Sequence, residues 1–285
     1  MAMMPIPPLM ARAIAQARLD EDTLKHIDSL PLPGDAGHGY DPFGLHRDFV
    51  KLGMCIAKPL YDRYWRVLSY GSENIPKDGP GVLAANHSGT VPTDGMMLWC
   101  DVILSAGRIP RPIADHFVPT LPVIGTFFSR GGMVGGSRGN ARALLGAGEL
   151  LMIFPEGTPG IGKHFRDRYK LARWRVGHAE LAMRHGAPVI PVAFVGPEEQ
   201  MPQIARLDGL GKVLGLPYMP IPATPLPLPV RYRIFYGEPI PLDKDYRPQD
   251  ADDPEAVAEA AAKVGDAVQA LIDDGLAQRG GRLFT

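Results

Sequence analysis

The sequence predicts an α/β fold, in which a mixed, largely parallel β-sheet is flanked by helices. Two observations predict it. From residue 67 onward, short apolar runs alternate with longer segments of helical periodicity. Before residue 67, two amphipathic stretches are separated by a linker rich in proline and glycine. We therefore divide the chain into an N-terminal helical segment, residues 1–66, and an α/β domain, residues 67–285, which ends in a C-terminal helix.

The strand candidates are short, apolar and bounded by turn residues. They are residues 67–70, 81–85, 112–114, 150–154, 189–195 and 230–236. The helix candidates repeat apolar residues every three or four positions, and they are residues 94–106, 120–129, 139–148, 171–184 and 254–277. In the N-terminal segment, residues 9–30 and 46–68 have helical spacing, and Pro59 is expected to kink the second stretch. Ligands of open α/β sheets bind beyond the carboxyl ends of the strands, so we expect the chemistry there.

The composition excludes several classes of function. The 30 Lys and Arg residues balance 31 Asp and Glu residues, which disfavours a nucleic-acid partner. Two cysteines, Cys55 and Cys100, do not form a disulfide framework, so a reducing compartment is expected. No Cys/His cluster has metal-ligand spacing, so neither a metal nor another cofactor is expected. The composition does not indicate an oligomeric state.

Membrane association is expected without a membrane span. The N-terminus has no basic segment ahead of a long apolar one, so no secretory signal is expected. One uncharged run, residues 213–230, reaches the length of a span, but its six prolines exclude a spanning helix. We interpret residues 214–230 as a loop that enters the membrane interface or covers the site. The sequence thus predicts a cytoplasmic protein bound peripherally to membrane lipids.

Residues 86–94, Asn-His-Ser-Gly-Thr-Val-Pro-Thr-Asp, follow a buried strand and enter a helix. Transfer of an acyl group to a hydroxyl needs a base of near-neutral pKa and a group that fixes its tautomer. His87 and Asp94 provide these two residue types, and they are the catalytic candidates. On residue types alone, a structural histidine and a helix-capping aspartate are an equally open interpretation.

Residues 154–158, Phe-Pro-Glu-Gly-Thr, follow another strand. Glu156, Gly157 and Thr158 offer a carboxylate, free backbone N–H groups and a hydroxyl, which suit a polar headgroup or a glycerol. An ordinary strand-to-loop turn is the alternative interpretation.

Residues 132–140 are rich in glycine, which lets a backbone approach a ligand closely. Arg138 follows these glycines at the start of a predicted helix, where it can pair with a phosphate. The glycine spacing fits neither the dinucleotide-binding nor the nucleotide-binding loop, so neither NAD nor ATP is predicted.

The order and spacing of these segments resemble the glycerolipid acyltransferase family, the group of lysophosphatidic acid acyltransferases and their relatives. His87 and Asp94 correspond to its catalytic block, and Arg138 to its second block. Residues 154–158 match the third block letter for letter, and residues 189–192 fit the fourth. The resemblance extends over about residues 67–240.

The resemblance implies a glycerol-phosphate acyltransferase-like fold, an acyl-CoA or acyl carrier protein donor, no metal, and His87 as the base. It also implies that Arg138 and the Glu-Gly-Thr of the third block bind the acceptor. Six residues separate His87 from Asp94 where the common pattern has four, which is similar to the mono- and diacylglycerol acyltransferase-like branch. Residues 135–137, Gly-Gly-Ser, replace a frequent Pro-Val-Asp, which favours a neutral or unusual acceptor.

A basic stretch at residues 163–175 has aromatic residues interleaved with its charges. Its candidates for contact with the donor or the membrane are Lys163, Arg166, Arg168 and Lys170. They can bind the phosphates of coenzyme A or anionic lipid headgroups. A solvated, charged helix face is the alternative.

The predicted function is acyl transfer to the hydroxyl of a glycerolipid or lysophospholipid, without a covalent intermediate. Two alternatives use the same site, a lipid or acyl-thioester hydrolase and a phospholipid transacylase. A third alternative is a lipid-binding protein without catalytic activity.

Overall fold

A seven-stranded sheet lies at the centre of the protein. The structure, a computed structural model, describes residues 6–32, 34–91, 93–115, 118–121, 123–207 and 218–284. The strand order is β1-β9-β6-β2-β5-β3-β4. The bounds are β1 Leu68–Tyr70, β2 Gly81–Ala85, β3 Arg111–Ala114, β4 Val134–Gly135, β5 Leu150–Ile153, β6 Val189–Val195 and β9 Arg233–Tyr236. Strands β4, β3, β5, β2 and β6 run parallel, whereas β9 is antiparallel to β6 and parallel to β1. The predicted mixed, largely parallel sheet is confirmed.

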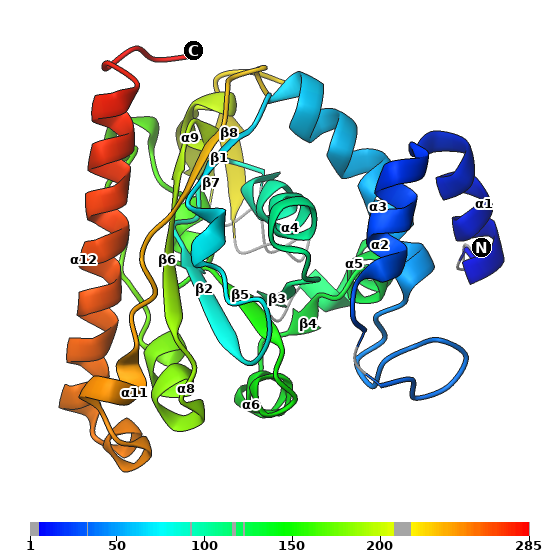
Figure 1. The fold of residues 1–285 in the computed structure, drawn as a ribbon. Helices are drawn as coiled ribbons and strands as arrows, with labels where there is room; N and C mark the ends of the chain where they lie inside the picture. The colour runs from blue at the N-terminus through cyan, green and yellow to red at the C-terminus, as the bar shows by residue number, and fades with distance from the viewer. Residues whose placement is uncertain are drawn as a thin grey trace.

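Helices cover both faces of the sheet (Figure 1). Helices α3 (Arg47–Pro59) and α4 (Thr93–Ala106) lie on one side. Helices α6 (Arg138–Gly146), α8 (Gly177–His185) and α12 (Pro254–Gln278) lie on the other. Strand β2 shows why both faces must be covered, because all its residues are buried. Leu83 and Ala85 belong to the core under α3 and α4, and the alternate residues Val82 and Ala84 belong to the opposite core.

The N-terminal helices share the main core with the sheet. Helices α1 (Pro8–Arg18) and α2 (Glu21–Ser29) precede α3, and Ile27 and Met54 pack in the same cluster as Leu83. Farther along, a buried ion pair of 2.5 Å joins Asp41 to Arg111 of β3. The segment before residue 67 is therefore anchored in the sheet by apolar and ionic contacts, while the domain boundary itself stays a prediction.

Several shorter elements complete the described chain. They are the π-helical turn Leu60–Tyr64, the 3-10 turns Ser72–Asn74, Val118–Thr120, Phe165–Asp167 and Pro248–Asp252, and the helices α5 Ile124–Arg130, α7 Thr158–Ile161, α9 Pro197–Gln200 and α11 Leu242–Asp245. The π-helical turn follows Pro59, where a kink is expected. In this turn the N–H of Trp65 donates to Leu60 O, so the helical pattern changes directly after the proline.

Two regions differ from the sequence-based expectation. The helix predicted at residues 171–184 begins only at Gly177. Earlier in the predicted helix, Ala172 donates its N–H to the side chain of Glu156 and not to a helical carbonyl. The predicted interfacial loop, residues 214–230, contains β8 (Met219–Pro222), which pairs antiparallel with β7 (Gln203–Leu207). Residues 213–217 of that run lie outside the described residues. Within the described ranges, no helix combines the length and apolarity needed to cross a bilayer.

His178 makes the stability of this fold sensitive to acid. It is 2% exposed in the first turn of α8; its Nδ1–H donates to Arg175 O at 2.9 Å, and its Nε2 accepts from the Trp174 indole at 3.3 Å. Burial lowers the pKa of His178 to about 4 from its ordinary 6.5. The unfolded chain therefore binds one more proton than the folded chain between these values, so stability falls as pH falls.

From pH 7 to pH 4.5, we expect this one group to lower the free energy of unfolding by about 2 to 3 kcal/mol. Urea unfolding of the wild type and of His178→Gln at both pH values measures the effect. The glutamine variant should lose that part of the acid dependence, and His185→Gln, on the same helix, should keep it. An equal acid-induced loss in His178→Gln and the wild type would contradict the assignment.

Candidate active site

Three polar groups meet at one edge of the sheet. Strands β5, β2 and β6 are neighbours and run parallel, so their carboxyl ends lie side by side. His87 follows β2, Glu156 follows β5 and Glu198 follows β6. This is the edge at which α/β sheets bind their ligands.

His87 and Asp94 are in direct contact. Nδ1 of His87 lies 2.8 Å from Oδ2 of Asp94, whose side chain is fully buried at the start of α4. A carboxylate only accepts hydrogen bonds, so the contact assigns the proton to Nδ1 and leaves Nε2 as a proton acceptor. The backbone N–H groups of Ser88 and Gly95 also donate to Asp94, each at 2.8 Å, and fix its orientation.

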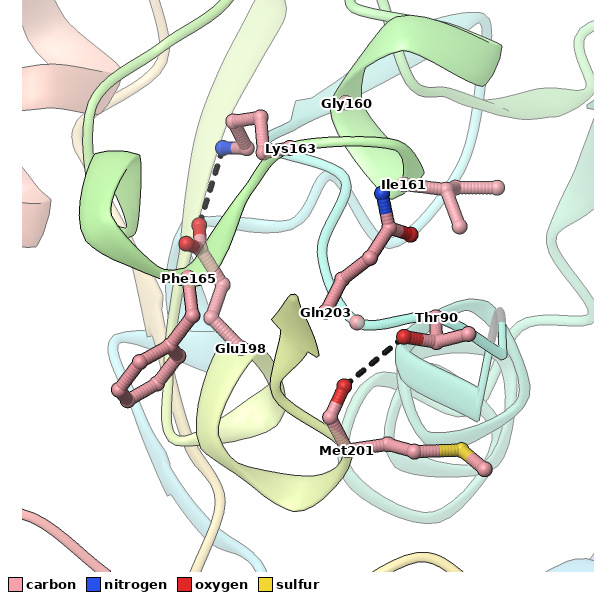
Figure 2. Close-up of a pocket in the computed structure, with 9 residues that line it drawn as sticks. Thr90, Gly160, Ile161, Lys163, Phe165, Glu198, Met201 and Gln203 are labelled. Carbon is pink, nitrogen blue, oxygen red and sulfur yellow. Dashed lines mark hydrogen bonds and ion pairs between the residues drawn. The ribbon is translucent and has the colours of Figure 1, made fainter. Parts of the chain in front are cut away.

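The loop between these two residues explains how they meet across six intervening positions. Gly89 has a φ of +83°, in the left-handed region that favours glycine, so the chain reverses there. Thr90 then ties the loop to the segment after β6, because its hydroxyl donates to Met201 O at 2.8 Å (Figure 2). The longer spacing therefore still brings the carboxylate back to the imidazole.

The ring of His87 is held by packing as well as by its hydrogen bond. It stacks on Phe154 with ring centroids 4.1 Å apart and an interplanar angle of 27°. The side chain of His87 is 11% exposed. The imidazole is thus oriented on two sides and still reaches the solvent-accessible surface.

A cavity of about 260 Å³ is lined in part by Phe154, the ring on which His87 stacks. Phe154, Gly157, Arg138 and Arg175 are among its lining residues, whereas His87 is not. Arg138 has a 79% exposed side chain, and its Nε lies 3.9 Å from the carboxylate of Glu180. The guanidinium of Arg175 packs against Gly157, where a Cβ atom would come within 3.0 Å of it.

The charged lining of this cavity is mixed. Arg138, Arg175 and the N-terminus of α6 lie on it, and so do Asp115 and Glu180. Arginine side chains and a helix N-terminus favour negative charge, whereas the two acids oppose it. The cavity therefore offers cationic contacts to a headgroup, although its lining has no net positive charge.

Glu156 contacts the backbone of His87. It is fully buried; its Oε1 accepts the N–H of His87 at 2.9 Å, and its Oε2 accepts the N–H of Ala172 at 2.5 Å. Both oxygens are thus engaged within the protein, which differs from the contact to an acceptor that the resemblance implies. Thr158 donates to Asp115 at 2.9 Å, and Gly157 lines the cavity. Acceptor contacts of Gly157 and Thr158 stay a prediction.

The basic stretch divides into one inward-facing and three outward-facing residues. Lys163 points into the protein, where its Nζ lies 2.9 Å from Glu198 Oε1 and its side chain is only 10% exposed (Figure 2). This placement does not fit the predicted contact with a donor or a headgroup at the surface. Arg168 is half-buried with its guanidinium over the ring of Phe165, and Arg166 and Lys170 are exposed. For these three residues, the predicted contact stays open.

Glu198 was not predicted from the sequence. It is buried, and its carboxylate contacts Lys163 and accepts the N–H of Tyr169 at 2.7 Å. A signal was present, because Glu198 and Glu199 follow the wholly apolar strand β6 after two intervening residues, at the edge where polar groups gather. Across the described residues, no group of three or more His, Cys, Asp or Glu side chains is arranged to hold a metal ion.

The chain is similar to known acyltransferases in sequence and in fold. A family model described as Acyltransferase matches residues 66–195. An uncharacterized protein of Mycobacterium tuberculosis is 39% identical over 253 residues, which cover 84% of this chain and 69% of the relative. The human DGAT1/2-independent enzyme synthesizing storage lipids is 30% identical over 210 residues, 72% of this chain and 60% of that enzyme. The 1-acyl-sn-glycerophosphate (LPA) acyltransferase of Thermotoga maritima has the same fold, with a TM-score of 0.50 and 18% identity over 94% of this chain and 97% of its own.

Proposed function

The chain belongs to the glycerolipid acyltransferase family, and on that premise we propose that it moves a fatty acyl group from a thioester to a lipid hydroxyl. The donor is acyl-CoA or acyl carrier protein, and the acceptor is a glycerolipid or lysophospholipid. The observation that carries the proposal is the 2.8 Å contact between His87 and Asp94, next to a cavity with two arginines. The likeness of this chain to the human storage-lipid enzyme also supports the resemblance to the mono- and diacylglycerol acyltransferase-like branch.

His87 acts as the general base in the proposed mechanism. Its Nε2 takes the proton of the acceptor hydroxyl while the hydroxyl oxygen attacks the thioester carbonyl. Asp94 stabilises the imidazolium that forms. The carbon–sulfur bond then breaks, and the leaving thiolate takes the proton from His87. No covalent acyl-enzyme forms, and the base is regenerated in each cycle.

We also propose that the protein binds the bilayer surface, where its substrates reside. Exposed apolar side chains support this, among them Leu9 and Met10 of α1 and Ile124 and Phe128 of α5. Helices α1 and α5 are joined through a shared cluster that includes Ala11 and Phe49, with Phe127 packed against it. Apolar groups on neighbouring elements are typical of proteins that lie on a membrane.

An acceptor screen tests the proposed reaction. Labelled palmitoyl-CoA is offered with lysophosphatidate, monooleoylglycerol, dioleoylglycerol or hexadecanol, and the lipid products are identified. Acylated acceptor and free CoA in equal amounts are expected. Free fatty acid without an acylated lipid would indicate the hydrolase, and transfer between phospholipids without acyl-CoA would indicate the transacylase. Binding of acyl-CoA without turnover would indicate a lipid-binding protein.

Arg138→Met separates acidic from neutral acceptors. Loss of one charge-assisted contact should raise KM for lysophosphatidate about tenfold or more. KM for monooleoylglycerol should not change. Arg247→Met, which alters an 81% exposed arginine of a different surface loop, serves as the control. An unchanged KM for lysophosphatidate in Arg138→Met would remove this residue from the acceptor site.

A further inference from the structure

A buried charge cluster lies next to the catalytic loop. Lys163 stands between two carboxylates. Its Nζ lies 2.9 Å from Glu198 Oε1 (Figure 2) and 3.3 Å from Glu156 Oε2. Nζ also donates to the carbonyl of Lys170 at 3.1 Å. Both carboxylates have almost no exposed surface, so one ammonium group compensates two buried acids.

The cluster is connected to the backbone of His87. The second oxygen of Glu156, Oε1, accepts the His87 N–H at 2.9 Å. The turn that leads to Lys163 packs closely against His87. A Cβ atom at Gly160 would come within 2.9 Å of His87 O and 3.0 Å of His87 Cβ. The position of His87 relative to the sheet thus depends on Glu156 and on the segment that ends at Lys163.

The charge of Lys163 decides how strongly Glu156 holds this backbone. Burial lowers the pKa of Lys163, but Glu198 and Glu156 raise it, and the net shift is upward, so the ammonium form is favoured. Burial raises the pKa of Glu198 to about 7 against the opposing effect of Lys163. Removing the ammonium group deprives the buried carboxylate of Glu156 of its ion pair with Lys163. The carboxylate that accepts the His87 N–H is then held less firmly in place.

We propose that Lys163 is a positioning residue for His87, which it holds in place through the carboxylate of Glu156, and that Glu198 keeps Lys163 in this position. The inference rests on the proposed role of His87 as the base. Because Lys163 acts on the geometry of the base, we expect its loss to slow the chemical step and to change substrate binding little.

Lys163→Met tests the proposal, with Lys25→Met as the matched control. Lys25 lies on α2 in an exposed pair with Glu21. Rates are measured with palmitoyl-CoA and the most active of the four acceptors of the screen. We expect Lys163→Met to lower kcat by about 10- to 100-fold, because small displacements of a catalytic group have effects of this size. KM for both substrates should stay within about twofold, and Lys163→Arg should recover most of kcat.

A double-mutant cycle with Glu156→Gln distinguishes positioning from general support of the fold. If Lys163 acts through the Glu156 charge, Lys163→Met should change kcat by less than about threefold in the Glu156→Gln background. Equal effects in both backgrounds, or an unchanged kcat in folded Lys163→Met, would overturn the inference. If Lys163→Met does not fold, Lys163→Met/Glu198→Gln replaces it, since the second change removes one buried charge, and the same criteria apply.

His87→Ala keeps this test separate from the proposed function. Activity retained in His87→Ala would mean that His87 is not the base, and the proposed mechanism itself would fail. Activity lost in His87→Ala but retained in Lys163→Met would leave the mechanism intact and reject only the positioning role.

Discussion

Replacing His87 by alanine should lower kcat for acyl transfer by about 10²- to 10⁴-fold, the range that a positioned general base typically contributes. The imidazole is the group whose Nε2 is left as an acceptor by the contact between Nδ1 and Asp94. Without it, the acceptor hydroxyl must attack as a neutral alcohol, with only water to take its proton. Initial rates at saturating palmitoyl-CoA and acceptor measure the loss.

The fold of this variant must be checked, because the ring also packs on Phe154. His87→Gln keeps most of the side-chain volume and should lose a similar share of kcat. His185→Gln, on α8, should retain wild-type activity and serves as the histidine control. A folded His87→Ala variant with kcat within tenfold of the wild type would reject the mechanism.

Replacing Asp94 should have the second-largest effect, and its size depends on the replacement. Asp94→Asn can place its amide oxygen where Oδ2 now accepts from His87 and Ser88, so the histidine tautomer is kept. The amide nitrogen then replaces Oδ1, which accepts the N–H of Gly95, so the variant loses this contact together with the negative charge that stabilises the imidazolium. We expect kcat to fall by about 10²-fold. Asp94→Ala removes the orientation as well, and its kcat should approach that of His87→Ala.

The double variant His87→Ala/Asp94→Ala tests whether the two residues act as one unit. If Asp94 works only through His87, the double variant should be about as active as His87→Ala alone, because residues of one catalytic unit have non-additive effects. A further loss of more than about tenfold in the double variant would show a separate role for Asp94. Urea unfolding of each variant accompanies the rates, since Asp94 also accepts two backbone N–H groups.

The sheet and its main helices could be predicted from the sequence because their patterns are local. Strands β2 and β6 begin and end at the predicted residues, since each is a fully buried apolar run bounded by turn residues. The long helix α12 starts at Pro254 after the N-cap Asp253, which is a strong local signal. The likeness to acyltransferases likewise came from short, contiguous motifs.

The remaining features depend on contacts between distant segments, and no local pattern encodes them. Residues 171–176 have helical periodicity but are drawn out of a helix by contacts such as that of Ala172 with Glu156. A lysine in a basic stretch looks like a surface residue, and only the fold shows that Lys163 turns inward to two carboxylates. Residues 219–222 pair with β7, and two of the prolines expected to exclude a spanning helix, Pro220 and Pro222, lie within β8.

The position of β9 has a consequence for the order in which the protein assembles. β9 lies between β6 and β1, and residues 68–70 of β1 pair with residues 233–235 of β9. β1 is synthesised early and its partner β9 much later, so β1 has no partner strand until β9 has been made. Closing such a long loop is entropically costly and makes folding slow. Trp65, three residues before β1, stacks on Tyr232, directly before β9, so this contact between the N-terminal segment and the sheet also requires a residue that is synthesised late.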